Sequence, residues 1–204
     1  MKRILICLLL LTASWGAFAQ NEAEVLLEKT ADAIRRADGI KASFSVKMDD
    51  EMVEGDIRLK GSKFKLETEG VTTWFDGKTQ WTLVDESQEV NISEPSAEEL
   101  QGINPYAWLS LYQQGYGLKM ESSSNADEKA IVMTSTQPRQ DMQCIVLTVN
   151  TRTLAPVRVT MAGRGGKDVT VVYITAYDAS QHYNDQEFVF PQGQYPGVEV
   201  VDLR

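Results

Sequence analysis

The fold is decided by one stretch of the chain, Val71-Thr72-Thr73-Trp74-Phe75-Asp76-Gly77-Lys78-Thr79-Gln80-Trp81-Thr82-Leu83-Val84. Asp-Gly is typical of a tight turn, because glycine tolerates positive φ and aspartate tolerates the left-handed region. The runs on both sides are rich in aromatic, β-branched and threonine residues, which is the composition of strands. We therefore predict a β-hairpin with large aromatic side chains near its turn. Two tryptophans and a phenylalanine so close together must contact something apolar.

The runs next to this hairpin alternate between apolar and polar residues. Residues 40–48 place Ile40, Ala42, Phe44, Val46 and Met48 on one side. Residues 53–60 and 63–67 repeat the pattern before the hairpin, and residues 90–92 repeat it after a polar turn. A period of two indicates a strand with one apolar and one solvated face. Six such strands joined by short turns predict an antiparallel meander.

Helices are predicted before the first strand and near the middle of the chain. Asn21 can cap a helix that buries Leu27, Ala31 and Ile34 and ends at Asp38-Gly39. Ser96 with Glu99 predicts a capped helical turn, and a second short helix should run from Asn104-Pro105 to Gly115. Strand patterns resume over residues 116–120, 131–133, 142–149, 157–161 and 169–177, with a last apolar segment at 188–190.

These elements predict an α+β, mainly β fold with about eleven strands in a single domain of residues 20–204. A meander of this length must curl, and its apolar face must be covered by the helices. The pattern leaves two alternatives open, a sheet packed on helices with a solid core and a sheet with a cavity beneath the helices.

The first nineteen residues have the pattern of a secretory signal peptide. Met1-Lys2-Arg3 is followed by an apolar run over residues 4–11 and by Ala17-Phe18-Ala19, a cleavage site of the A-x-A kind. We expect cleavage near Ala19 and export. Removal of residues 1–19 leaves 18 basic and 29 acidic residues, a net charge of −11. Such a surface disfavours binding to nucleic acid, which needs a basic footprint.

Catalytic and metal-binding patterns are not found in the sequence. His182 is the only histidine, and no HExxH or paired-cysteine spacing accompanies it. Cys144 lies within an alternating apolar run, where a small buried residue is the simpler interpretation. Without a nucleophile and base pair, we expect no enzymatic activity, no cofactor and no metal.

The hairpin and the segments around it resemble the LolA family of periplasmic carriers of outer-membrane lipoproteins. The resemblance begins at Asp76-Gly77-Lys78-Thr79-Gln80-Trp81, with Gln88 shortly after. It continues in Phe44 and Gly55-Asp56-Ile57-Arg58-Leu59 before the hairpin. After it, the matching segments are Asn104-Pro105-Tyr106-Ala107-Trp108-Leu109, Phe188-Val189-Phe190-Pro191 and Pro196-Gly197-Val198-Glu199-Val200.

The resemblance implies an unclosed antiparallel β-barrel covered by an N-terminal helix and a short helical lid, with a hydrophobic cavity for acyl chains. It also implies acylated lipoproteins as ligands, an inner-membrane ABC transporter of the LolCDE type and an outer-membrane acceptor of the LolB type as partners, and a periplasmic location. The family commonly carries Arg-Pro after its Gly-Asp strand, where this chain has Gly61-Ser62 beside Lys60. The gating role given to that arginine therefore cannot be transferred.

The candidate residues for lining the cavity are large apolar side chains on the predicted strands and the helical insertion. They are Phe44, Val46, Met48, Ile57, Leu59, Phe64, Leu66, Trp74, Trp81, Leu83 and Trp108. Two alternatives to a lipoprotein carrier remain. One is a lipid-binding sensor or chaperone domain for another acylated ligand, and the other is a secreted structural protein with a filled core.

Overall fold

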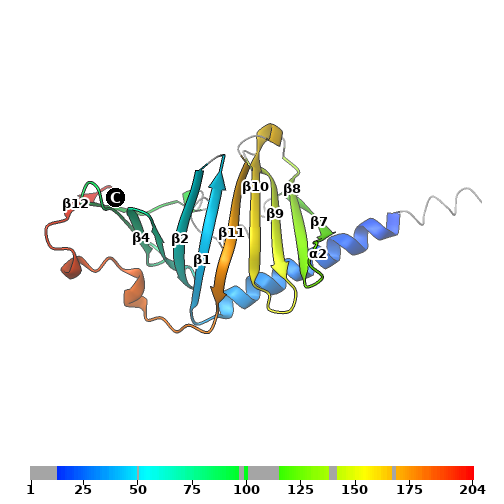
Figure 1. The fold of residues 1–204 in the computed structure, drawn as a ribbon, viewed down its shortest axis with the longest axis horizontal. Helices are drawn as coiled ribbons and strands as arrows, with labels where there is room; N and C mark the ends of the chain where they lie inside the picture. The colour runs from blue at the N-terminus through cyan, green and yellow to red at the C-terminus, as the bar shows by residue number, and fades with distance from the viewer. Residues whose placement is uncertain (1–12, 50, 97–98, 101–114, 138–141, 167–168) are drawn as a thin grey trace, which may run out of the picture.

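The computed structural model describes residues 13–49, 51–96, 99–100, 115–137, 142–166 and 169–204. In these residues twelve strands form one sheet, and one long helix packs against it (Figure 1). The helix is α2 (Ala13–Arg36). The strands are β1 (Ile40–Met48), β2 (Glu51–Lys60), β3 (Lys63–Thr68), β4 (Val71–Phe75), β5 (Gln80–Val84), β6 (Glu89–Ser93), β7 (Tyr116–Ser122), β8 (Glu128–Ser135), β9 (Met142–Asn150), β10 (Pro156–Gly163), β11 (Val169–Asp178) and β12 (Glu199–Asp202). The described residues also form the short 3-10 helices η2 (Arg164–Gly166), η3 (Asp185–Phe188) and η4 (Gln192–Gln194).

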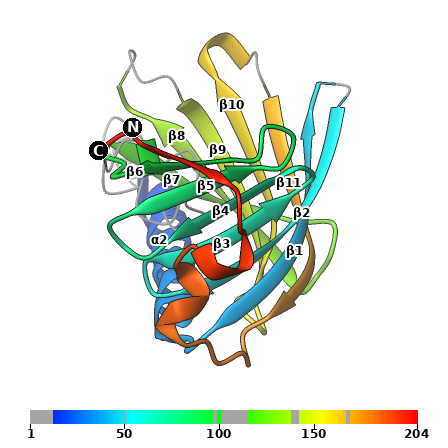
Figure 2. The ribbon, with the colours of Figure 1, turned by 90° about the vertical axis from the view of Figure 1, so that its left-hand side faces the viewer.

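The sheet consists of two meanders that meet at its centre. Strands β1 to β6 form the first meander and β7 to β11 the second, and β11 pairs with β1. Neighbouring strands are antiparallel except β12, which pairs with β6 in parallel. Among the described strands, β12 and β7 end the sheet without pairing to each other, so the barrel stays open. Figure 2 shows the two halves of the sheet curling toward one another. The predicted α+β, mainly β fold with an unclosed barrel is confirmed.

The opening hairpin forms as the sequence predicted. Trp74 lies opposite Trp81 and Phe75 opposite Gln80, so residues 76–79 make the loop. The Asp76 carboxylate accepts hydrogen bonds from the backbone N–H groups of Lys78 (2.9 Å) and Thr79 (2.8 Å). Gly77 adopts a φ of 103°, a region that favours glycine. The Asp-Gly pair therefore stabilises this turn by a local side-chain bond and by backbone freedom.

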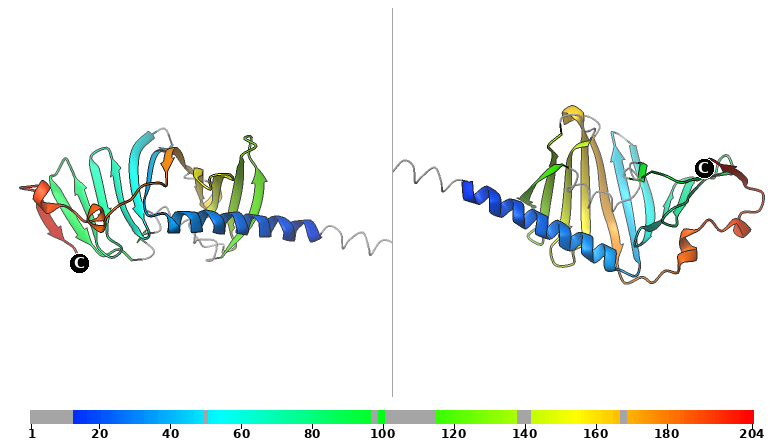
Figure 3. Two further views of the ribbon diagram at one scale, coloured as in Figure 1. Left: turned by 90° about the horizontal axis from the view of Figure 1, so that it is seen from below. Right: turned by 180° about the vertical axis from the view of Figure 1, so that it is seen from behind.

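Helix α2 packs on one face of the sheet, which we call the inner face; the opposite face is the outer face. Seen from behind in Figure 3, the helix crosses the strands of the second meander. Its buried residues Ala23, Leu27, Ala31 and Ile34 belong to the main core cluster. That cluster continues on alternate positions of both meanders, including Ile40, Ala42, Ile57, Leu59, Phe64, Phe75, Ile131, Met133, Ile145, Leu147, Val159 and Val172. Of the helices in the described part of the chain, none is long and apolar enough to cross a membrane.

The outer face carries a second cluster beneath the last part of the chain. We call residues 179–204 the C-terminal strap. Trp74, Leu83 and Val90 of the first meander are buried there with Phe190 of the strap. The ring centres of Trp74 and Phe190 lie 5.3 Å apart in an edge-on arrangement. The ring centres of Phe190 and Tyr195 also lie 5.3 Å apart, and these two rings are stacked. The strap then ends in β12, which extends the sheet beside β6. Strands β4 to β6 are thus covered on their outer side.

Three predictions about secondary structure need correction or lie outside the described residues. The helix does not start at Asn21 but at Ala13, since residues 13–20 contain no proline and supply several alanines that favour helix. The segment 188–190 is not a strand: Phe188 ends η3, and Phe190 is buried by packing on Trp74 rather than by strand pairing. The helix predicted from Asn104 lies outside the described residues.

The capped turn at Ser96 is confirmed. The Glu99 carboxylate accepts hydrogen bonds from the Ser96 backbone N–H (2.8 Å) and hydroxyl (2.7 Å). The Ser96 hydroxyl in turn accepts from the Glu99 N–H at 3.3 Å. This reciprocal pair is a capping box, and it lowers the pKa of Glu99 through the hydrogen bonds from Ser96.

Candidate ligand-binding face

The predicted cavity residues divide between the two faces of the sheet. Seven of them share the inner face: Phe44, Val46, Met48, Ile57, Leu59, Phe64 and Leu66. Trp74, Trp81 and Leu83 project from the outer face, where they belong to or pack on the second cluster. Trp108 lies outside the described residues. The structure therefore does not bring the two described tryptophans together with the other candidates.

The short turn between β3 and β4 causes this division. Residues 69 and 70 form the turn, so Thr68 pairs with Val71 and Phe64 pairs with Phe75. Phe75 consequently shares the inner face with Phe64, and Trp74 faces the opposite way. The turn signal at Glu69-Gly70 is visible in the sequence, and counting outward from it would have identified Phe75 as the inner-face aromatic residue.

The inner face has a covered part and a half-exposed part. Ile57, Leu59 and Phe64 are buried in the main core with α2. Phe44, Val46 and Leu66 are only half-buried, and Met48 is 44% exposed. On the second meander, Met161 and Ile174 are half-buried beside the same core. We call the half-exposed set, Phe44, Val46, Met48, Leu66, Met161 and Ile174, the inner rim.

Within the inner rim, the Phe44 ring packs tightly against the backbone of β2. This ring lies over Gly55, its cross-strand partner in β2. A Cβ atom built on Gly55 would lie 2.6 Å from Cζ of Phe44 and 2.6 Å from the backbone oxygen of Glu67. Only glycine leaves room for the ring at this position, because a real Cβ cannot approach a backbone oxygen so closely. The glycine of the Gly-Asp strand therefore positions an aromatic side chain of the inner rim.

Methionine is concentrated on the inner face. Of the seven methionines in the chain, Met133 is buried in the main core, and Met120, Met142 and Met161 pack against it. Met48 is in register with Thr170 at the exposed end of the same face. The methionine side chain is flexible and polarizable and adapts to ligands of different shape. The sequence prediction included only Met48, although the other methionines also occupy apolar positions of alternating runs.

The inner face becomes polar beyond β4. The hydroxyls of Thr73 and Thr82 lie 3.4 Å apart, and the Gln80 amide donates to the Thr82 hydroxyl at 3.2 Å. Oε1 of Gln80 is buried and has no hydrogen-bond partner among the residues that the structure describes. The partly open apolar surface of the inner face therefore lies on β1 to β3 and the second meander, whereas Thr73, Gln80 and Thr82 add polar groups on β4 and β5.

Two ionisable side chains on or near the inner face have raised pKa values. Burial raises the pKa of Tyr177, on the inner side of β11, to about 12. Burial also raises the pKa of the half-buried Cys144 thiol, which favours the protonated, unreactive form. His182 is exposed, and its Nδ1 lies 2.8 Å from a carboxylate oxygen of Asp38. No group of three or more potential metal ligands occurs among the described residues.

The lysine before the β2–β3 turn contacts the C-terminal strap. Gly61 forms the β2–β3 turn with a φ of 56°. Lys60 donates a hydrogen bond to the backbone oxygen of Tyr183 and lies 3.6 Å from the Asp185 carboxylate. This lysine therefore holds the C-terminal strap on the outer side of the sheet.

Comparison with known proteins places the chain in a family. Residues 14–166, from α2 to η2, match the model of a family described as outer membrane lipoprotein carrier protein LolA. No curated protein sequence matches the chain. In structure, an uncharacterized conserved protein from Thermus thermophilus is similar with a TM-score of 0.61 at 13% identity, over 86% of this chain and 98% of that one. MucB is similar with a TM-score of 0.52 at 15% identity, over 89% of this chain and 66% of MucB. These two likenesses show the fold, and the family match over three quarters of the sequence shows that the chain belongs to the family of the outer membrane lipoprotein carrier protein LolA.

Proposed function

We propose that the protein is a periplasmic carrier that shields acyl chains of lipoproteins on its inner face and moves them from the inner to the outer membrane. The observation that carries this proposal is the inner rim. Its six apolar side chains remain partly open to solvent, and five of them pack against the main core cluster. Exposed contiguous apolar surface on a single chain is typical of an interaction site. An acyl chain is the ligand that the family membership favours.

The energetics of an acyl ligand require direct transfer between proteins. Burial stabilises an acyl chain by about 0.8 kcal/mol per methylene. About fifteen methylenes then contribute roughly 12 kcal/mol, comparable to nanomolar affinity. Release into water would be correspondingly slow. We therefore propose docking to an inner-membrane ABC transporter of the LolCDE type and delivery to an outer-membrane acceptor of the LolB type.

Lipid analysis of the native protein tests the proposal. The chain is expressed from its full sequence with its own N-terminal segment, purified from the periplasmic fraction without detergent, and extracted for mass spectrometry. N-terminal sequencing of the same sample checks cleavage near Ala19. We expect acylated peptide or lipid in near-stoichiometric amount. A chain that contains no lipid and takes up no fluorescent fatty acid would contradict the carrier function and support a structural protein with a filled core.

A further inference from the structure

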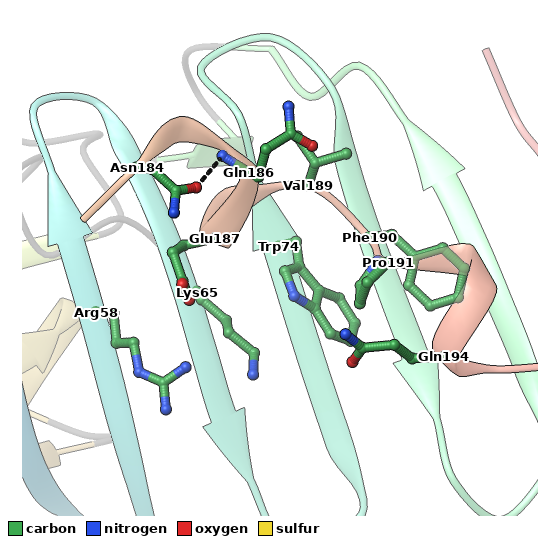
Figure 4. A pocket seen from close by; sticks show the side chains of 10 residues that line it. All are labelled: Arg58, Lys65, Trp74, Asn184, Gln186, Glu187, Val189, Phe190, Pro191 and Gln194. Atoms are coloured by element: carbon green, nitrogen blue, oxygen red, sulfur yellow. Dashed lines mark hydrogen bonds between the residues drawn. The ribbon is translucent and has the colours of Figure 1, made fainter.

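A second pocket lies on the outer face, between β2 to β4 and the C-terminal strap (Figure 4). Its volume is about 420 Å³, within the range of small-molecule sites. The floor is a row of cross-strand neighbours, Arg58, Lys65 and Trp74. The strap contributes the opposite wall, with Asn184, Gln186, Glu187, Val189, Phe190, Pro191 and Gln194. We call this space the outer pocket; the sheet separates it from the inner rim.

The outer pocket is rich in hydrogen-bond donors. Three neighbouring strands present a guanidinium, an ammonium and an indole N–H, and Figure 4 shows these side chains in a row beneath the strap. The strap adds side-chain amides at Asn184, Gln186 and Gln194. The Nζ of Lys65 lies 5.4 Å from the centre of the Trp74 ring, so the ammonium is close to the aromatic face. Such a set of groups can hold a charged oxygen ligand and a flat or apolar substituent together.

The two cations share one carboxylate. Glu67 lies 2.7 Å from Nζ of Lys65 and 3.5 Å from Arg58. The side chains of Lys65 and Arg58 are only 15% and 29% exposed, so water screens them weakly. Glu187 lines the strap side and is exposed. The two cations of the floor thus face two carboxylates, Glu67 beside them and Glu187 on the strap, in a chain whose net charge is −9.

We propose that the outer pocket binds a small anionic group, a carboxylate or a phosphate, whose attached apolar part packs on the half-buried Val189 and Pro191. Arg58 and Lys65 would donate charge-assisted hydrogen bonds to the anion, which are about twice as strong as neutral ones. The anion can belong to a free solute or to the headgroup of an acidic lipid. This site is independent of the acyl-binding function proposed for the opposite face.

Binding measurements on the full chain and matched variants test this site. The first arm titrates inorganic phosphate and glycerol 3-phosphate by calorimetry; the second measures co-sedimentation with phosphatidylglycerol vesicles against phosphatidylcholine vesicles. Lys65→Gln removes one of the two cations of the pocket. Lys119→Gln is the control, because Lys119 also pairs with a glutamate two residues on at 2.7 Å, but is 68% exposed on β7.

We expect Lys65→Gln to weaken anion binding about tenfold, as for the loss of one charge-assisted hydrogen bond, and Lys119→Gln to leave it unchanged. Binding in the first arm identifies a free anion, and binding only to phosphatidylglycerol vesicles identifies a lipid headgroup. If neither probe binds, or if both variants bind like the parent chain, the proposal is overturned. If circular dichroism shows that Lys65→Gln does not fold, Arg58→Gln replaces it in the same titrations. The NMR signal of the Trp74 indole N–H in the parent chain should then also shift when phosphate is added, and no shift would contradict the proposal.

Discussion

Trp74 and Trp81 are direct cross-strand partners in the β4–β5 hairpin, and both project from the face of the sheet opposite to α2. Trp74 is 2% exposed and lies edge-on to the rings of Phe190 and Tyr195. The two tryptophans of the hairpin therefore pack in the outer cluster with the C-terminal strap, and not on the surface where we propose that acyl chains bind.

Replacement of Trp74 should reduce stability without affecting acyl binding. Removal of a buried tryptophan leaves a cavity that costs about 3–5 kcal/mol. We expect Trp74→Ala to lower the free energy of unfolding by this amount in urea titrations, and Trp81→Ala, at a half-buried position, to lower it less. Uptake of a fluorescent fatty acid by the folded Trp74→Ala variant should equal that of the parent chain. A selective loss of uptake would place the ligand on the outer face instead.

A charge on the inner rim should prevent acyl binding. Met48 is 44% exposed on the inner face, and Met52, in the same hairpin, is 57% exposed on the outer face. Both substitutions to glutamate add the same charge at exposed sites, so neither should unfold the protein. We expect Met48→Glu to weaken fatty-acid binding about tenfold or more, because a carboxylate against an acyl chain loses its hydration.

The matched variant Met52→Glu should bind fatty acid with unchanged affinity, as measured by fluorescence titration. Equal losses in both variants would show that net charge, and not the inner rim, controls binding. No loss in either would remove Met48 from the ligand-binding surface.

The alternation of apolar residues was sufficient to predict the strands of both meanders. It was insufficient to predict which side of each strand the helix covers, because β4 is buried on both sides: Thr73 and Phe75 inward, Trp74 outward. A pattern with period two identifies a face only when the other face is solvated. The turn at Glu69-Gly70 held the missing information, since turn length fixes the register across a hairpin.

Contacts between distant parts of the chain could not be read from local pattern. The strap buries Phe190 against Trp74 and pairs β12 with β6, across more than one hundred residues of sequence. The run 198–201 contains valines suited to a strand, but a parallel edge pairing has no turn that specifies it. The outer pocket was missed for the same reason, because its two walls come from β2–β4 and from residues 184–194.

Acid should loosen the C-terminal strap. Hydrogen bonding from Lys63, at 2.7 Å, lowers the pKa of Asp185, and the hydrogen bond with His182 lowers the pKa of Asp38. A carboxyl group with a lowered folded-state pKa stabilises the fold above its unfolded pKa, about 3.9, and this contribution is lost as the pH falls through the folded value. We expect hydrogen exchange in residues 183–190 to accelerate below about pH 4, relative to the core of β9.

Asp185→Asn should reproduce this loosening at neutral pH. The variant removes both ion pairs to Lys60 and Lys63, so limited proteolysis should cut the strap a few times faster. Asp127→Asn is the control, because Asp127 forms an exposed ion pair with Arg152 far from the strap. If Asp185→Asn is cut at the parent rate, the aromatic contacts alone hold the strap.

Alkaline pH should destabilise the protein through Tyr177. This phenol is half-buried on the inner face beside Ala42, and burial raises its pKa to about 12. A folded pKa above the unfolded value of about 10 means that the stabilisation is complete below pH 10 and is lost as the pH rises toward 12. The free energy of unfolding should therefore fall between about pH 10 and about pH 11 by no more than about 1.4 kcal/mol on account of this group.

Urea titrations at both pH values measure the fall in the free energy of unfolding. Tyr177→Phe, which keeps the ring but cannot ionise, should show a smaller fall. Tyr116 and Tyr183 also have raised pKa values, so the difference between the parent chain and Tyr177→Phe isolates the contribution of Tyr177. An identical fall in both proteins would mean that Tyr177 ionises without cost in the folded state, and hence that water reaches this part of the inner face.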